Sequence, residues 1–470
     1  MTVPLEGRSD ITLEVFERVA WQREPVEIAP PAIAVMDRCH SAFEAFIADR
    51  LASDPNAQIY SITFGPGDSG AVDLTHDTRP TKLWTAASFG EPLPERVARG
   101  IVLARLANFL EGHAAARSLV ATSIAAMLDP GVPIPNVPAQ ANGGAGEILP
   151  LGHLFYDLSE RVPLEPKERM ALINGSPCAA ALVADVALAA RGRTELAERV
   201  FALSVEALGS PLEAYSADVD ALWGDEHESA ALRSLRGLLH DGRPQRMARQ
   251  SPVSHRILAR VLGGLRRAAA EADHAAAVSL ASVTDNPVYI PPDATRPLGT
   301  VFSTGGYHNT RAPAAIDGMA FAWADLCQLA ERHTDQLFQH PATGPLLAPH
   351  EFGYKSLHMA MNGWAEEARS LAQPTLLSLG AFGQNDVPSQ SFPAWRRATS
   401  IGRCLDASLA IVATLAARAL AVGGQPIPRE LRALVDEVHE HVLSGPEVRR
   451  LGLELEALTT AFAHRVSPAG

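Results

Sequence analysis

The stretch from Pro138 to His153 is rich in glycine, so its backbone could adopt an unusual conformation that supports chemistry. It reads Pro138-Ala-Gln-Ala-Asn-Gly-Gly-Ala-Gly-Glu-Ile-Leu-Pro-Leu-Gly-His153, with two adjacent glycines, a third at Gly146, and Glu147 directly before an apolar turn. Glycine allows left-handed backbone conformations, and an acidic residue before an apolar run is typical of a helix start. The stretch therefore predicts a tight backbone turn followed by a helix. Taken alone, it is better explained by an ordinary loop and helix cap.

Histidines and cysteines are the side chains that could bind a metal. His439 and His441 are two apart on an expected helix and so face different directions, while His333 and His340 are seven apart without carboxylates at a supporting spacing. The cysteines form no Cys-x-x-Cys pair; they are Cys39, Cys178, Cys327 and Cys404. We therefore expect no metal site and no disulfide framework, and we interpret the cysteines as reduced thiols in the core.

Composition excludes several classes of partner. The chain has 470 residues, 47% of them hydrophobic, and a formal net charge of -13. It has no lysine-rich or arginine-rich run, which argues against nucleic acid and anionic membranes and leaves small substrates open. The first residues lack a basic segment followed by an apolar run, and we expect no stretch long enough to span a bilayer. These features predict a cytoplasmic protein.

The elements that must position any site are mostly helices. Apolar residues recur at helical spacing, as in Val102, Leu106, Phe109 and Leu110, and in Met319, Trp323, Leu326 and Ala330. The clearest alternating run, residues 58–64, predicts one short strand or an extended loop. We therefore expect a mostly α fold in two portions, 1–200 with the glycine-rich loop and an irregular N-terminal region, and 201–470 with a central bundle of long helices.

Read in order, separated motifs of this chain resemble those of the aromatic amino acid lyase family, the ammonia-lyases and aminomutases that act on histidine, phenylalanine and tyrosine. The loop at 144–153 resembles Gly-Ala-Ser-Gly-Asp-Leu-Ala-Pro-Leu-Ala-His. The other matching segments are Ile59-Tyr-Ser-Ile-Thr-Phe-Gly-Pro-Gly67, Gly90-Glu-Pro-Leu-Pro94, Ala171-Leu-Ile-Asn-Gly175, Gln250-Ser-Pro-Val-Ser-His-Arg256, Thr284-Asp-Asn-Pro287, Ser303-Thr-Gly-Gly-Tyr-His308, Leu329-Ala-Glu-Arg332 and Gln384-Asn-Asp386. An ordered series is more specific than any one motif. The resemblance implies an ammonia-lyase-like fold and a homotetramer with active sites assembled from several subunits.

The resemblance also exposes four departures. In the family, an Ala-Ser-Gly triad cyclises and loses the serine hydroxyl as water, which creates the methylidene-imidazolone electrophile. Here the triad reads Gly144, Ala145 and Gly146, and alanine has no hydroxyl to lose. Val253, Thr85 and Asn385 replace the family's tyrosine, histidine and acidic residue at positions resembling active-site positions. We therefore expect the prosthetic group to be absent, and the reaction to be changed or lost.

Other positions keep the residue that the family uses. Tyr60 matches the catalytic tyrosine that removes the β-proton, although it could instead be a structural tyrosine; as a base near neutrality it would need a cation nearby. Arg256 matches the arginine that pairs with the substrate carboxylate, a role that suits a guanidinium. Further positions that match pocket-lining residues, each of which could also be a structural polar group, are Asn174, Gln250, Tyr307, His308 and Gln384.

Two added cations are candidate substrate contacts. Lysine is rare, at Lys82, Lys167 and Lys355, and Lys355 falls in a region that resembles a pocket-lining loop. Arg311 stands where the family often has proline. Both could equally be solvated surface cations.

Together these residues predict a cofactor-independent carbon-nitrogen lyase acting on a small amino-acid-derived substrate. A quaternary amine leaves without the covalent capture that a primary amine needs. One branch of the superfamily, ergothionase, eliminates trimethylamine from the betaine ergothioneine without the prosthetic group, and the resemblance to it rests on the missing serine. Two alternatives stay open: an inactive homologue that binds a ligand or an active relative, and an acid-base lyase, isomerase or cyclase acting on a natural-product intermediate.

Overall fold

Helices dominate the computed structural model, as residue spacing predicts. It describes residues 2–65, 85–247, 250–347, 354–377, 380, 383–442 and 450–466. In this part of the chain, short strands form two pairs, a parallel one between β1 (Val3–Leu5) and β2 (Val26–Ile28) and an antiparallel one between β3 (Val288–Ile290) and β4 (Thr300–Phe302). The α-helices are α1 (Leu13–Phe16), α2 (Pro30–Ser53), α3 (Glu95–Leu106), α4 (Ser118–Ala126), α5 (Ile148–Arg161), α6 (Pro166–Ile173), α7 (Pro177–Leu208), α8 (Ala217–Trp223), α9 (Glu226–Leu238), α10 (Val253–Arg256), α11 (Leu258–Leu280), α12 (Arg311–Gln339), α13 (Gly344–Leu347), α14 (Leu357–Leu371), α15 (Ser391–Val422), α16 (Arg432–His441) and α17 (Leu451–Val466).

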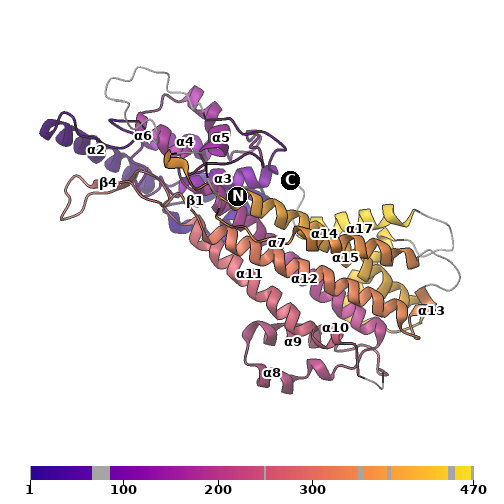
Figure 1. The fold of residues 1–470 in the computed structure, drawn as a ribbon. Coiled ribbons are helices and arrows are strands. Elements are labelled where there is room, and N and C mark those ends of the chain that lie inside the picture. Colours follow the sequence, from indigo (N-terminus) through magenta and orange to yellow (C-terminus); the bar gives the residue numbers. More distant parts are fainter. Residues whose placement is uncertain are drawn as a thin grey trace.

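A bundle of long helices forms the centre of the molecule (Figure 1). The helices α7, α11, α12 and α15 pack along one another, and α14 and α17 lie against them. Alanine and leucine give α7 high helix propensity, Pro177 occupies its first turn, and Gly209 ends it at φ 69°. This helix is buried along most of its length, so it is the core of the bundle. Residue 200, where the sequence suggested a boundary, lies inside α7.

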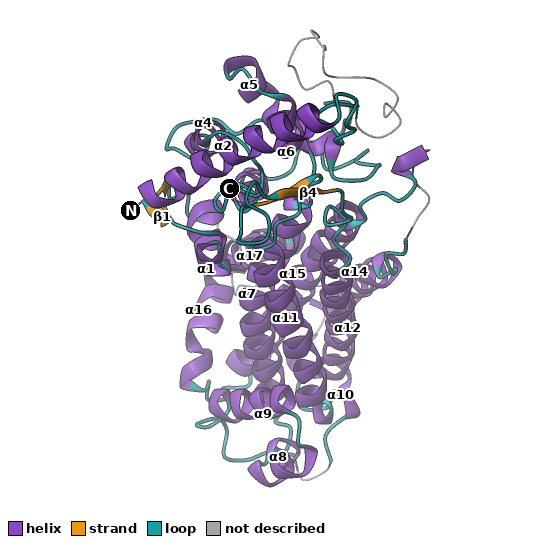
Figure 2. Cartoon of the chain, turned by 90° about the vertical axis from the view of Figure 1, so that its left-hand side faces the viewer, coloured by secondary structure: helices purple, strands orange, loops and turns teal. Residues whose placement is uncertain are grey.

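Several of the shorter helices gather at the two ends of the bundle. Figure 2 shows α2, α4, α5 and α6 above the bundle and α8, α9 and α10 at the opposite end. The helices that cross between the ends start or stop near the triad loop: α7, α12 and α15 begin there, and α11 finishes there. Residues on the same long helix can therefore belong to opposite ends of the molecule.

The residues predicted to face the core do so. Both apolar sets are buried, namely Val102, Leu106, Phe109 and Leu110, and Met319, Trp323, Leu326 and Ala330. The cysteines are also buried and unpaired, as expected for core thiols. Helical spacing of apolar residues was thus sufficient to identify the buried face of α12.

Two expectations about segments were wrong. Residues 58–64 form a tight turn instead of a strand, with an isolated bridge between Tyr60 and Phe64 and Ser61 at φ 57°. The Thr63 hydroxyl closes this turn by donating to the Ala57 carbonyl and accepting from the Ile59 amide. The second wrong expectation is that no stretch is long enough to span a bilayer. Two segments, Pro166–Leu208 and Ser391–Val422, are long and apolar enough, but 100% and 83% of their most apolar windows are buried inside the protein.

Buried ion pairs fix how the central helices lie against one another. Arg193 of α7 forms a 2.7 Å pair with Asp406 of α15, and its guanidinium lies 4.7 Å from the Trp323 ring centroid of α12. The Asp406 side chain is 1% exposed, so removing its charge would leave the guanidinium without a counter-ion in the core. One arginine thus ties three helices together.

We predict that Asp406→Asn lowers the free energy of unfolding by about 3 kcal/mol, because it leaves a buried cation unpaired. Urea denaturation followed by circular dichroism measures the change. The matched control is Glu366→Gln, which breaks the exposed pair with Arg369 and should cost less than about 1 kcal/mol. Equal effects of the two substitutions would contradict this account.

Candidate functional site

The triad loop and the residue that follows it have a left-handed backbone at three positions. Gly144, Gly146 and Glu147 have φ values of 88°, 73° and 57°, and helix α5 starts at the next residue. A Cβ at Gly146 would lie 2.7 Å from the Asn174 Oδ1, whereas a Cβ at Gly143 would meet no atom within 4 Å. The predicted tight turn and helix start are therefore present, and the loop packs closely against Asn174 at one position.

Two backbone hydrogen bonds hold this loop from other parts of the chain. The Gly175 amide donates to the Gly146 carbonyl at 3.2 Å, and the Ser389 amide donates to the Gly144 carbonyl at 3.2 Å. Gly175 precedes α7 and Ser389 precedes α15, so the bundle fixes both ends of the triad. Ala145 lies between the two anchored carbonyls.

The carboxyl of Glu147 anchors the loop to the start of α7. Its two oxygens accept hydrogen bonds from the Cys178 amide at 2.6 Å and the Ala179 amide at 2.9 Å. These amides belong to the first turn of the helix, where backbone donors lack partners within the helix. Burial raises the pKa of Glu147 to about 7, while the amide bonds and the Arg105 guanidinium oppose that rise. Glu147 therefore has a positioning role.

Asn174 lies at the centre of a buried polar network. Its side-chain Nδ2 donates to the Asn286 main-chain carbonyl at 3.1 Å, and its main-chain carbonyl accepts from Arg105 Nη1 at 2.7 Å. The Oδ1 atom is buried without a hydrogen-bond partner among the described residues. Nearby, Lys167 pairs with the buried Asp285 at 2.6 Å. Sequence reasoning assigned no role to Arg105 or Lys167, although a charged residue in an apolar helix is a usable signal.

A cavity of about 520 Å³ opens over the triad. Most of its lining is apolar or backbone, and the lining residues are Ala141, Gly143, Gly144, Ala145, Ile148, Leu149, Gly380, Asn385 and Pro388. Ala145, at the position of the family's serine, and Asn385, at the position of its acidic residue, therefore face one space. Thr85, at the histidine position, packs against α5, where its Oγ1 would lie 2.4 Å from a Cβ at Gly152.

Several predicted residues lie at the same end of the bundle as the triad. Tyr307 follows Gly306, which lies close to Thr284, since a Cβ at Gly306 would be 3.6 Å from the Thr284 Cα. The Thr284 hydroxyl in turn accepts a hydrogen bond from the Ser176 amide, just before α7. His308 follows in the same loop, Arg311 starts α12 with its Nη1 3.5 Å from His274 Nε2, and Gln384 neighbours Asn385. Ile62, two residues after Tyr60, packs on the cluster that contains Tyr289 of β3. The cavity lining does not include Tyr60.

Gln250, Arg256 and Lys355 lie at the other end. Arg256 ends α10, whose Ser254 carbonyl contacts His333 of α12 at 3.3 Å. His333 is roughly 30 Å along α12 from Arg311, at 1.5 Å per residue. Lys355 lies in the short turn Tyr354–Ser356 that leads into α14, and His358 of α14 contacts Glu331 of α12 at 3.4 Å. Within one chain these three residues are thus separated from Ala145. Lys82 and residues 348–353 lie outside the described residues.

A pair of stacked histidines supports α10. The rings of His255 and His333 are parallel within 5°, with centroids 4.1 Å apart, and both residues are fully buried. Their Nδ1 atoms each face a serine hydroxyl at 2.9 Å, Ser210 for His255 and Ser204 for His333. Burial lowers the pKa of His333 to about 4 and that of His255 well below its usual range. The rings are therefore neutral at neutral pH.

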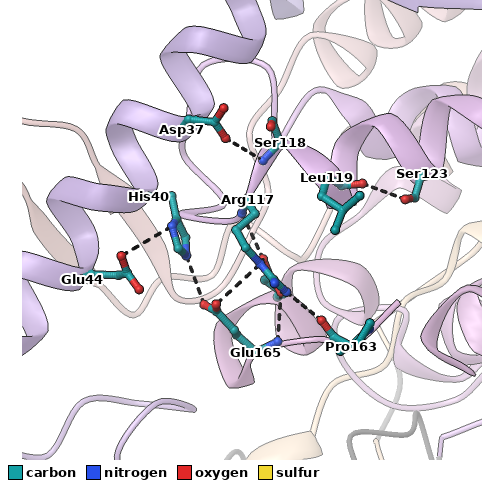
Figure 3. A network of polar contacts seen from close by, with 10 residues as sticks. Asp37, His40, Glu44, Arg117, Ser118, Leu119, Ser123, Pro163 and Glu165 are labelled. Atoms are coloured by element: carbon teal, nitrogen blue, oxygen red, sulfur yellow. Dashed lines mark hydrogen bonds and ion pairs between the residues drawn. The ribbon is translucent and has the colours of Figure 1, made fainter. Parts of the chain in front are cut away.

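One cluster of described residues has the composition of a metal site. His40 and Glu44 of α2 and Glu165 before α6 place one ligand atom each within 4.8 Å of one another. Figure 3 shows that the two acids approach different ring nitrogens, Glu165 at Nε2 and Glu44 at Nδ1, at 3.1 and 3.8 Å. Arg117 lies 3.5 Å from Glu165 and also pairs with Glu168. This geometry is that of an ion-pair network that joins α2 to α6.

Comparisons with known proteins agree with the geometry. The family model described as aromatic amino acid lyase matches residues 11–161 and 158–442. Histidine ammonia-lyase of Symbiobacterium thermophilum is 29% identical across 97% of this chain and 95% of its own, and that of Anaeromyxobacter sp. strain K is 28% identical across 98% of each. The expected fold and family are thus confirmed.

Solved structures share the fold over nearly the whole chain. Ergothionase from Treponema denticola superposes with a TM-score of 0.86 at 19% identity, covering 99% of each chain. Phenylalanine aminomutase of Pantoea agglomerans gives 0.88 at 18% identity, again covering 99% of each chain. At these identities the likeness establishes the fold alone.

We predict that Gly146→Ala destabilises the protein by about 1–3 kcal/mol, because alanine is strained at positive φ and its Cβ would displace Asn174. Thermal unfolding measures the loss. Gly143→Ala in the same loop is the control and should change stability by less than about 0.5 kcal/mol, since its Cβ meets no atom. A Gly146→Ala protein as stable as the control would contradict the assigned packing.

We predict that the histidine pair makes the protein sensitive to acid. Histidines in the unfolded chain have pKa values of about 6.5, whereas His333 in the folded chain has a pKa of about 4. Between these two pH values the unfolded chain therefore binds more protons than the folded chain. The stability contributed by neutral rings is complete above about pH 6.5 and is lost as pH falls towards 4. The melting temperature should fall as the pH is lowered through this window, and it should fall less steeply in His333→Gln. The exposed His464→Gln should leave the slope unchanged.

Proposed function

Since the chain belongs to the aromatic amino acid lyase family, we propose that it is a carbon-nitrogen lyase that eliminates a tertiary amine from an amino-acid-derived betaine without the methylidene-imidazolone group. The observation that carries this proposal is Ala145, a methyl side chain on the cavity wall where the family has serine. The known route to the electrophile starts with loss of that serine hydroxyl. Because Ala145 has no hydroxyl to lose, turnover would require a reaction that does not use this electrophile.

The lining of the cavity favours a fully methylated nitrogen. A primary ammonium carries three N–H donors and needs acceptors when it is buried, whereas a trimethylammonium has none. Ala145, Ile148, Leu149 and Pro388 supply apolar surface, and Asn385 supplies a neutral amide in place of a carboxylate. The structural neighbour ergothionase is described as an ergothioneine-degrading enzyme, which agrees with a betaine substrate.

The proposed reaction uses Tyr60 as the base. Its phenolate takes the β-proton, the C–H electrons form the Cα–Cβ double bond, and the Cα–N bond breaks with its electron pair moving to nitrogen. The leaving group is already a neutral tertiary amine, so no covalent capture is needed. Tyr60 then returns the proton to solvent.

Arg256 is proposed to hold the substrate carboxylate with Asn174. In one chain these residues lie at opposite ends of the bundle, so the site is completed by Arg256 from a second copy. A homotetramer of the kind that the family resemblance implies would supply that copy. Lys355 and Arg311 are the proposed contacts for the remainder of the substrate.

We predict that purified protein releases trimethylamine from ergothioneine or hercynine, with a rise in conjugated acrylate absorbance, and that it does not deaminate free histidine. Tyr60→Phe should reduce the rate at least about a hundredfold, as expected for loss of a general base. Tyr156→Phe, at a 38% exposed tyrosine, is the matched control. Intact mass should equal the unmodified sequence.

Ammonia release from free amino acids, with a mass lowered by two waters, would refute the electrophile-free mechanism. Binding of a betaine without turnover would instead identify a binding protein.

A further inference from the structure

A second cavity, of about 340 Å³, lies at the start of α3. Its wall is made by Arg23, by Glu95 and Arg99 of α3, and by residues 130–133 after α4. None of these residues lines the cavity over Ala145. The volume is at the lower end of the range for small-molecule pockets.

The guanidinium of Arg99 is nearly enclosed by protein and faces this cavity. The residue is 3% exposed, its Nε donates to the Val19 carbonyl at 3.1 Å, and its Nη2 donates to the Leu128 carbonyl at 3.0 Å. The third nitrogen, Nη1, has no hydrogen-bond partner among the described residues. It is also not among the sealed, unpartnered nitrogens, unlike Nη2 of Arg105. Since Arg99 lines the cavity, Nη1 is the guanidinium nitrogen that the described residues leave available to a bound molecule.

The charges around the cavity leave one cation unbalanced. Arg23 pairs with Glu95 at 2.9 Å, so these two charges offset each other. Arg99 contacts two backbone carbonyls and has no ion pair with a described carboxylate. Burial lowers the pKa of Arg99, because the cation loses its hydration there. Glu95 attracts the Arg99 cation and Arg23 repels it, but neither forms a direct ion pair with it. A buried guanidinium without such a pair costs free energy that a bound anion would offset.

We propose that this cavity is a binding site for a small oxyanion, a carboxylate or a phosphate, held by Arg99 Nη1 with Arg23 as a second donor. A guanidinium donates to such oxygens in a planar geometry that both classes match. The anion would complete the hydrogen bonding of Arg99 and bring one negative charge to a lining with one net positive charge.

Binding at this site should stabilise the region that positions Asn174. Arg99 joins three segments, since Val19 precedes α2, Leu128 follows α4, and Arg99 itself belongs to α3. The same helix carries Arg105, which holds the Asn174 carbonyl. Stability is therefore the direct readout, and it does not depend on which substrate the protein turns over.

Calorimetric titration and thermal shift of the full-length protein with phosphate and with malonate test the proposal, against sodium chloride of equal ionic strength. We expect saturable binding of one anion per chain and a rise in melting temperature. Arg23→Gln should weaken binding about tenfold, the loss expected for one charge-assisted hydrogen bond. Arg369→Gln, at an exposed arginine that is not part of the lining, is the control and should bind as the unaltered protein does.

A second variant avoids removing Arg99, whose two carbonyl contacts support folding. Val132→Asp places a carboxylate on the cavity wall, so it should abolish anion binding and raise the melting temperature of the anion-free protein. Tighter binding of phosphate than malonate, or the reverse, identifies the class of oxyanion. No saturable binding by either anion, or equal binding by Val132→Asp and the unaltered protein, would overturn the proposal.

Discussion

The carboxyl of Glu147 is the contact on which the site depends most. It accepts two amide hydrogen bonds from the first turn of α7, the most deeply buried helix of the bundle. The backbone that leads to it passes through positive φ at Gly144 and Gly146, so the loop is forced outward between two anchored carbonyls. Ala145 is presented to the cavity as a result. The scaffold that would hold an electrophile is thus retained around a residue that has no hydroxyl.

The bundle divides the candidate residues between its two ends. Helix α12 carries Arg311 at one end and, roughly 30 Å away, the His333 that stacks on His255 beside Arg256. The rigid histidine pair gives Arg256 a fixed position although α10 has a single turn. As the proposed carboxylate contact, Arg256 would reach a cavity of this kind only where two copies of the chain meet. The separation and the family resemblance therefore lead to the same proposed assembly.

The sequence predicted the long helices and the glycine turn, because apolar spacing and glycine report directly on burial and backbone conformation. It predicted a strand or extended loop at 58–64, because alternation does not reveal that the Thr63 hydroxyl closes a turn. It also assigned no role to Arg105 or to the Lys167–Asp285 pair, since these contacts join residues far apart in the chain. The family resemblance had already assigned Ala145 and Asn385 to active-site-like positions, and the structure has both on the wall of one cavity.

The hydrogen bond from Ser389 to Gly144 has a consequence for how the protein forms during synthesis. Ser389 lies two residues before the start of α15, so its amide reaches the loop only after most of the chain has been made. Contacts between such distant segments are slow to form, and long chains commonly fold through partly packed intermediates. The N-terminal helices can therefore emerge from the ribosome and pack while the cavity wall is still missing. Pocket completion would be among the last steps of folding, and a chain interrupted before α15 would lack both a finished site and one of the four central helices of the bundle.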